Sequence, residues 1–406
     1  MTPRSKHPII REYKEKVSAA RYQIGVSQAA YLPQVQFLSY FNYGLSTPTG
    51  TQTTATTTAT SFAVPTAQRV AKDYYVYRFQ MNQLIYDFGK TLGQIGQSRA
   101  TYHQTEDDYT GTRQKVVLDA RSAFFGLLAA QRAAKVTAEN VRLNQDLVKQ
   151  AMGFYKVGLK AKIDVTTAEA KLYDAEASNI RAKNQVDLAR VSLMTALGLK
   201  TWPYKEIEDV MEVAHQAPSL AELKAQALRQ RPEVVKNIHT QDFYQQAYRT
   251  ARAGFLPSLT SSAAWGWQGA EEFLPTNKNW YVGVSLTMPL FDGLLALNNV
   301  RVARANQRAT LADAEVLQQD VAKEVEQAYL DVKTYWELIR STKKAMEAAR
   351  ENFRLAQGRY QVGVGSIIEV TDAQVQYFQS ELKYVQALYD YRINEAKLDK
   401  AIGKAF

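Results

Sequence analysis

Apolar and polar side chains alternate along two segments of the chain, as in β-strands with one apolar face. The first segment places large side chains at every second position, at Tyr75, Tyr77, Phe79, Met81 and Ile85. The second does so at Trp280, Val282, Val284, Leu286, Met288 and Leu290. With Val35–Leu45 and Ser258–Trp267 as partners, they predict four strands of about 10 residues, the length and composition of outer-membrane strands. A soluble sheet edge or sandwich is the alternative, because such alternation is weak in any one segment.

Proline-free stretches between the strands predict very long helices. No proline lies between Pro65 and Pro203 or after Pro289, so a helix is uninterrupted there. Each rod would span about 100 Å at 1.5 Å per residue. The returning helix carries an apolar stripe stepping by three and four, at Val165, Ala168, Leu172, Ala175, Asn179, Ala182, Val186, Ala189, Leu193 and Ala196. This stripe predicts a coiled-coil seam, either in a barrel of tiled helices or in a two-stranded antiparallel coiled coil.

The chain contains an internal duplication. Tyr155-Lys-Val-Gly158 returns as Tyr360-Gln-Val-Gly363 after 205 residues (360 − 155), whereas Leu32-Pro33 returns as Leu256-Pro257 after 224 (256 − 32). The first repeat therefore holds 19 extra residues (224 − 205), which we assign to the Thr- and Ser-rich segment Ser46–Ser61 and expect to form an extracellular loop.

The duplication predicts two repeats, residues 7–198 and 220–403, joined by a linker at 199–219. In the first repeat we expect strands at about 34–45 and 74–86 and long helices at about 88–156 and 164–198. In the second we expect strands at about 258–267 and 280–290 and long helices at about 293–361 and 369–402. Because Leu220–Arg231 has no counterpart before His7, we also expect a trimmed N-terminus.

Composition narrows the class of protein. The 406 residues include no cysteine, which excludes disulfides and thiolate metal sites. The net charge of +10 is spread among acidic residues without a basic cluster, so we expect no nucleic acid partner. No apolar run is long enough for a membrane-spanning helix, which excludes an α-helical membrane protein. No apolar signal segment starts the chain, so we expect either a cytoplasmic protein or a mature chain without its signal peptide.

Catalytic chemistry finds no support in the sequence. The four histidines occur in no HExxH or paired arrangement, and Gly363-Val-Gly365 lacks the lysine of a phosphate-binding loop. Glu106-Asp107-Asp108 has no partner at metal-ligand spacing and fits a solvated helix face. We therefore expect no enzyme activity, no cofactor and no metal.

The order and spacing of these motifs resemble the TolC-type outer-membrane efflux family. The resemblance rests on Leu32-Pro33 and Leu256-Pro257 before the strands, Pro289-Leu-Phe-Asp-Gly293 after them, and the two Tyr-x-Val-Gly turns. It implies an α+β membrane protein: a homotrimer with a 12-stranded outer-membrane β-barrel, in contact with outer-membrane lipid, continued by a periplasmic α-helical barrel. Four strands cannot close a barrel alone, since the smallest have eight.

The resemblance also implies roles for the helix turns. The periplasmic tips would contact a periplasmic adaptor protein of an inner-membrane pump of the RND or ABC type, through Val157, Gly158, Leu159, Val362, Gly363 and Val364. Glycine suits a turn with positive φ, and apolar neighbours give a partner a surface to bury. A turn glycine with no partner role is the alternative.

A pore constriction and a gate are implied next to the second turn. The resemblance assigns the constriction to Glu369 and Asp372, which share a helix face, although an acidic pair near a helix N-terminus also fits a dipole contact. It assigns a gate hydrogen bond to Tyr360 and Asp164. A further link in the family needs arginine and threonine where this chain has Gly365 and Ile163, so we expect a more weakly held closed state.

These features predict a passive outer-membrane exit channel of a tripartite efflux or type I secretion system. The alternative is a soluble coiled-coil scaffold without transport activity.

Overall fold

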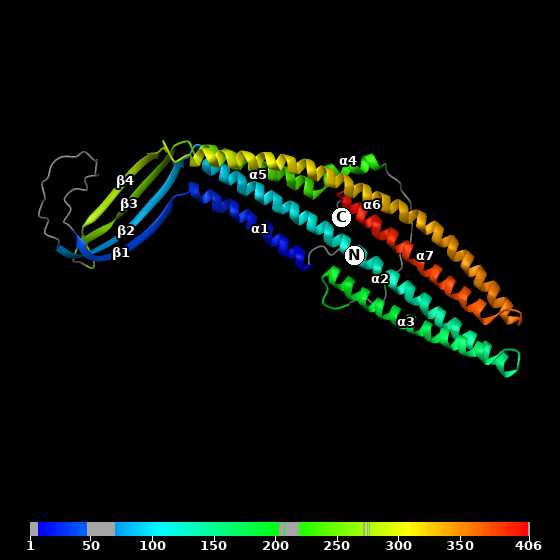
Figure 1. The fold of residues 1–406 in the computed structure, drawn as a ribbon. Coiled ribbons are helices and arrows are strands. Elements are labelled where there is room, and N and C mark those ends of the chain that lie inside the picture. The colour runs from blue at the N-terminus through cyan, green and yellow to red at the C-terminus, as the bar shows by residue number, and fades with distance from the viewer. Residues whose placement is uncertain are drawn as a thin grey trace. The chain divides into compact units, whose positions relative to one another are not determined.

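The structure is a computed structural model that describes residues 7–46, 70–202, 207, 219–270, 273, 275 and 277–404 (Figure 1). Its elements in chain order are α1 (Pro8–Gln28), the 3-10 helix η1 (Ala29–Tyr31), β1 (Gln34–Ser46), β2 (Val70–Tyr86), α2 (Lys90–Lys156), α3 (Lys162–Leu197), α4 (Leu220–Gln230), α5 (Pro232–Ala253), β3 (Ser258–Ala270), β4 (Lys278–Thr287), α6 (Leu295–Gln361) and α7 (Ile367–Ala401).

The chain divides into two compact units. The helical unit consists of Met1–Ser18, His103–His239 and Leu311–Phe406, and the strand unit of Ala19–Tyr102 and Thr240–Thr310. The long helices lie within two residues of their expected bounds. Most of the expected loop Ser46–Ser61 and much of the expected linker 199–219 lie outside the described residues.

The strand unit contains one antiparallel sheet in the order β1-β2-β3-β4. Its register places Phe37, Phe79, Trp265 and Trp280 side by side across the four strands, and the first three rings stack or tilt against one another at 5.1 and 6.3 Å. These side chains are 46–71% exposed. The sheet thus presents a broad, uncovered aromatic face.

Three strand bounds differ from the expected ones by three residues or more. β3 ends at Ala270 instead of about residue 267. β2 begins at Val70 instead of about residue 74, and β4 ends at Thr287 instead of about residue 290. Pro289 explains the earlier end, because proline has no N–H to donate to a neighbouring strand. The apolar alternation through Met288 and Leu290 therefore continues beyond the end of the strand.

Aspartates at equivalent positions of the two repeats stabilise the starts of the long helices. Asp87 accepts a hydrogen bond from the Thr91 backbone N–H at 2.7 Å, and Asp292 accepts one from the Ala296 N–H at 2.8 Å. A carboxylate satisfies free N–H groups there and interacts favourably with the helix dipole.

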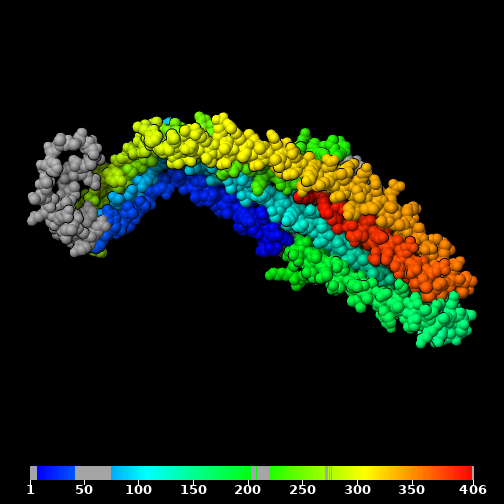
Figure 2. Space-filling view, in the orientation of Figure 1, coloured from blue at the N-terminus to red at the C-terminus, as the bar shows by residue number. Residues whose placement is uncertain are grey.

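The core of the helical unit nearest the turns is shared by α2, α3, α6 and α7. It contains Leu147, Ala151, Val165, Ala168, Phe353, Ala356, Tyr360, Ile367, Val370 and Ala373. Alanines at several of these positions let the helices approach closely, and Figure 2 shows α6 and α7 in contact along this unit. Every position of the predicted α3 seam is buried or half-buried, as a packed stripe requires.

Among the described residues, no helix combines the length and the apolar character needed to cross a lipid bilayer.

Candidate functional site

The candidate site is formed by two helix turns in the helical unit: the first turn, residues 157–161 between α2 and α3, and the second turn, residues 362–366 between α6 and α7. Both end their long helix in the same way. Gly158 and Gly363 have φ of 75° and 85°, and the Leu159 and Val364 N–H groups bond back to carbonyls five residues earlier, at 2.9 and 3.1 Å. Only glycine adopts this left-handed conformation without a steric cost.

Both turns expose apolar side chains. Val157, Leu159, Val362 and Val364 are 68–74% exposed, and the nearby Ile163 and Ile368 are 69% and 60% exposed. A clustered apolar surface of this kind is typical of a protein interaction site. The residues expected at the adaptor contact thus form an uncovered surface in this chain.

Tyr360 lies directly beneath the second turn and is fully buried. Its ring meets Phe154 edge-on at 5.6 Å, which ties the end of α6 to α2. Burial, followed by the nearby negative charge of Asp164, raises the pKa of Tyr360 to about 12. Its hydroxyl forms no hydrogen bond with the described residues. The expected gate partners are therefore neighbours, and Asp164 acts on the hydroxyl through its charge.

Glu369 and Asp372 are exposed in the first turns of α7, and each directly precedes a buried position, Val370 and Ala373 respectively. They differ in their partners. Glu369 forms an ion pair with Arg359 at 3.2 Å, whereas Asp372 forms no ion pair within the described part of the chain. The two carboxylates expected at the constriction thus share a surface, and the charge of Glu369 is partly neutralised by Arg359 of the same chain.

Lys160 is a residue of the site that the sequence analysis missed. Its ammonium donates a hydrogen bond to the Gly365 carbonyl at 3.0 Å and lies 5.7 Å from the centre of the Tyr360 ring. Lys160 and Gly365 are 205 residues apart, so they occupy equivalent positions in the two repeats. The available signal was the repeat itself, which makes Lys160 the equivalent of Gly365.

Gly365 permits this contact because its backbone lies tightly against the end of α6. Its N–H bonds to the Arg359 carbonyl at 2.9 Å, and a Cβ at this position would lie 2.8 Å from the Tyr360 nitrogen. Any other residue would push the second turn away from the helix. The glycine thus holds its carbonyl where Lys160 reaches it.

Buried amides connect α2 with α7 beyond the turns. Gln374 is 3% exposed and donates to the Asn140 side-chain oxygen at 2.9 Å, which also accepts from Asn144 at 3.0 Å. An adjoining cavity of about 340 Å³ has Thr137, Lys171 and Phe378 among its lining residues. Because a buried polar group without a partner is costly, these paired amides fix the register of the two helices.

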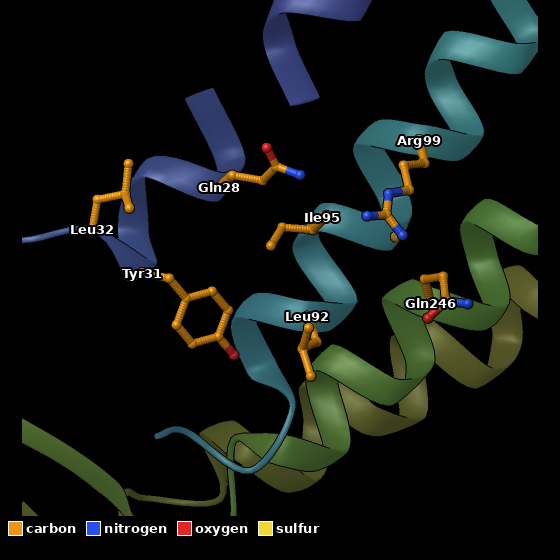
Figure 3. A pocket seen from close by; sticks show the side chains of 8 residues that line it. Gln28, Tyr31, Leu32, Leu92, Ile95, Arg99 and Gln246 are labelled. Carbon is orange, nitrogen blue, oxygen red and sulfur yellow. The ribbon is translucent and has the colours of Figure 1, made fainter. Parts of the chain in front are cut away.

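A second cavity, in the strand unit, has a volume of about 520 Å³ and lies among α1, α2 and α5 (Figure 3). In Figure 3, Gln28 and Ile95 point toward one another across it, and Arg99 and Gln246 line one side. It holds no nucleophile paired with a base. Within the described ranges, no group of three or more His, Asp or Glu side chains is arranged to hold a metal ion.

Comparisons with known proteins support one interpretation of this geometry. A family model described as "Outer membrane efflux protein" matches residues 4–199 and 223–404. The outer membrane protein TolC of Escherichia coli is 24% identical over 341 residues, which cover 80% of this chain and 68% of TolC. The toluene efflux pump outer membrane protein TtgC of Pseudomonas putida is 22% identical over 78% of this chain and 66% of its own length.

Solved structures share the fold. The outer-membrane channel OprN superimposes with a TM-score of 0.83 at 20% identity, over 98% of this chain and 87% of its own. The CmeC outer membrane channel of Campylobacter jejuni also gives 0.83, at 17% identity, over 99% of this chain and 84% of its own.

Proposed function

Because the chain belongs to the outer membrane efflux protein family, we propose that three copies of it form a passive exit duct that is gated at the two helix turns. The family consists of outer-membrane channel proteins that extend into the periplasm, not of enzymes. The predicted TolC-type channel is therefore supported, and the soluble coiled-coil scaffold is not.

The open sheet is the observation that carries the proposal. β1 and β4 are edge strands in the chain's own sheet, and one face exposes aromatic side chains over all four strands. Exposed edges and an apolar face favour aggregation in water, whereas a closed barrel in lipid satisfies both. Three copies supply the twelve strands of such a barrel.

The two turns provide the docking end of the duct. Their exposed Val157, Leu159, Val362 and Val364 fit the apolar core of a protein interface. The partner is a periplasmic adaptor protein of an inner-membrane pump of the RND or ABC type. The pump supplies the transport energy, and the relative TtgC, named for toluene efflux, favours small-molecule export.

The same end carries the gate. Glu369 and Asp372 of three copies form a carboxylate ring that attracts cations. Tyr360 and Lys160 hold the two turns of each copy together, Tyr360 through its buried ring and Lys160 through the Gly365 carbonyl, and Asp164 lies near the Tyr360 hydroxyl. Opening requires the second turn to move away from the first, which breaks the Lys160 contact.

A pair of matched variants tests the duct. Val282 lies on the aromatic face and is 73% exposed, whereas Ser285 lies on the opposite face of β4. Arginine in contact with lipid costs about 2–4 kcal/mol at mid-membrane depth, whereas arginine facing a lumen is tolerated. We expect Val282→Arg to reduce the amount of heat-modifiable trimer in outer-membrane extracts and Ser285→Arg to leave it unchanged. The Ser285→Arg protein should also give stepwise conductance in planar bilayers. Equal assembly of both variants, or a detergent-free soluble protein, would contradict the duct.

A further inference from the structure

We propose that Arg78 shifts the charge preference of the passage through the strand region toward anionic solutes, separately from the carboxylate ring at the helix turns, which attracts cations. This inference rests on the proposed function, because it requires that the sheet closes around a lumen. The surroundings of Arg78 give it a distinct role.

The register separates the sheet into two faces of different chemistry. One face carries Phe79, Met81, Trp265, Trp280 and Val282. The other carries Gln36, Gln80, Gln268, Asn279 and Ser285, together with apolar side chains such as Leu38 and Val76. In a transmembrane barrel the apolar face meets lipid and the polar face meets the lumen. The polar face is therefore the lumen wall.

Arg78 lies on this polar face, between Leu38 of β1 and Gly266 of β3. Among the side chains that the structure describes in the sheet, it is the only charged one on that face. Lys278 lies at the end of β4 opposite Trp267, on the aromatic face. The described part of the lumen wall thus has a single charge per chain, and it is positive.

Gly266 lets β3 approach β2 closely beside Arg78. A Cβ at Gly266 would overlap the Tyr77 carbonyl oxygen and would lie 2.5 and 2.6 Å from the Arg78 Cα and Cβ, so any larger residue would push the two strands apart. The glycine therefore keeps the Arg78 backbone in place against β3. This close approach accounts for a glycine in the middle of a strand, where it is otherwise unfavourable.

The charge of Arg78 is not compensated within the described residues. Its Nε is enclosed and has no hydrogen-bond partner, and no described carboxylate forms an ion pair with it. A pore wall of low dielectric focuses the field of a fixed charge into the lumen, where it enriches ions of opposite sign. Three copies would place three guanidinium groups around one passage, which matches an anionic solute or the anionic part of a larger one.

Cysteine chemistry on the assembled channel tests the inference, because the chain has no cysteine of its own. Purified Arg78→Cys channel is placed in a planar bilayer with a KCl gradient, and the reversal potential gives the ratio of chloride to potassium permeability. We expect the ratio to fall by about twofold relative to wild type. An aminoethyl thiosulfonate restores the positive charge and should raise the ratio again, whereas a sulfonatoethyl reagent should lower it further.

Lys278→Cys is the matched control, since both reagents should leave its permeability ratio unchanged. If Arg78→Cys is fully labelled by mass and neither reagent changes the ratio, or if Lys278→Cys responds equally, Arg78 does not shift the preference. Should the cysteine variant not assemble, Arg78→Gln replaces it, and an unchanged ratio there overturns the inference. Failure of the wild-type protein to form any channel would instead contradict the proposed function.

Discussion

The two helix turns have the same backbone but bury their tyrosines differently. Both follow a Tyr-x-Val-Gly sequence, and both close with a glycine at positive φ. Tyr155 before the first turn is 44% exposed, whereas its equivalent, Tyr360, is fully buried against Phe154. The duplication thus supplies a common turn, and the neighbouring helices decide which copy becomes part of the core.

The second turn is also the more tightly connected one. Ser366 caps α7 by accepting a hydrogen bond from the Ile368 N–H at 3.2 Å, whereas Ala161 at the equivalent position offers no side-chain cap to α3. The first turn instead contributes Lys160, which reaches across to the second. The second turn thus has the capped helix start and the accepting carbonyl, and the first turn supplies the lysine that binds it. Equivalent substitutions in the two turns should therefore have unequal effects.

The largest effect is expected from an acid at the turn glycines. Gly158→Asp and Gly363→Asp place a Cβ in the left-handed region, at about 1–2 kcal/mol, and put a charge among exposed apolar side chains. We expect drug export to fall to the level of cells without the channel, with trimers retained. Drug susceptibility and heat-modifiability of the trimer measure the two properties.

Glycines inside the adjacent helices provide the control for these variants. Gly153→Asp and Gly358→Asp add the same charge where the backbone is helical and a Cβ meets no atom within 4 Å. They should keep most export. Equal loss in all four variants would assign the effect to charge in general and not to the turns.

The second prediction concerns the carboxylates beyond the second turn. Glu369→Ala combined with Asp372→Ala should abolish block of the bilayer conductance by a trivalent cation, since hard cations bind carboxylate oxygens. Arg359→Gln should strengthen the block, because it frees Glu369 from its ion pair. Block that persists in the double variant would move the constriction to another part of the duct.

Removing the hydrogen bond from Lys160 of the first turn to the Gly365 carbonyl should have a smaller effect on the channel. A hydrogen bond from a charged group contributes about 1.5–3 kcal/mol when buried, and less for the half-buried Lys160. Lys160→Met keeps the length of the side chain and removes this bond, so we expect a severalfold rise in the conductance of the closed channel. Lys162→Met removes a neighbouring charge without a described side-chain contact and should leave the conductance unchanged. Equal conductance in both variants would show that Lys160 does not hold the two turns together.

Local pattern predicted the elements of this fold, and the repeat predicted which residues meet. The alternation at Tyr75–Met81 indicated β2, and equivalence with Tyr155-Lys-Val-Gly158 located the second turn. The pattern predicted too long a β4 because the apolar alternation continues past Pro289, whereas the hydrogen bonding between strands cannot. Lys160 escaped prediction because its contact depends on how two separate turns pack, and a glycine supplies the acceptor through its backbone.

The smallest effect is expected from the buried tyrosine, and it sharpens the contrast with Tyr155. The pKa of Tyr360 is raised from 10 to about 12, so the folded protein retains the phenolic proton that the unfolded chain loses. The stabilisation of the folded state that results from this pKa difference is complete below pH 10 and decreases as pH rises from 10 through 12. We expect the free energy of unfolding, from denaturant titration in detergent, to fall more steeply over this range in wild type than in Tyr360→Phe. Tyr155→Phe, at the exposed equivalent, should keep the wild-type slope. Because the Tyr360 hydroxyl has no hydrogen-bond partner among the described residues, its loss at neutral pH should raise the bilayer conductance only modestly. A Tyr360→Phe slope equal to that of wild type would mean that the hydroxyl is not enclosed beside Asp164.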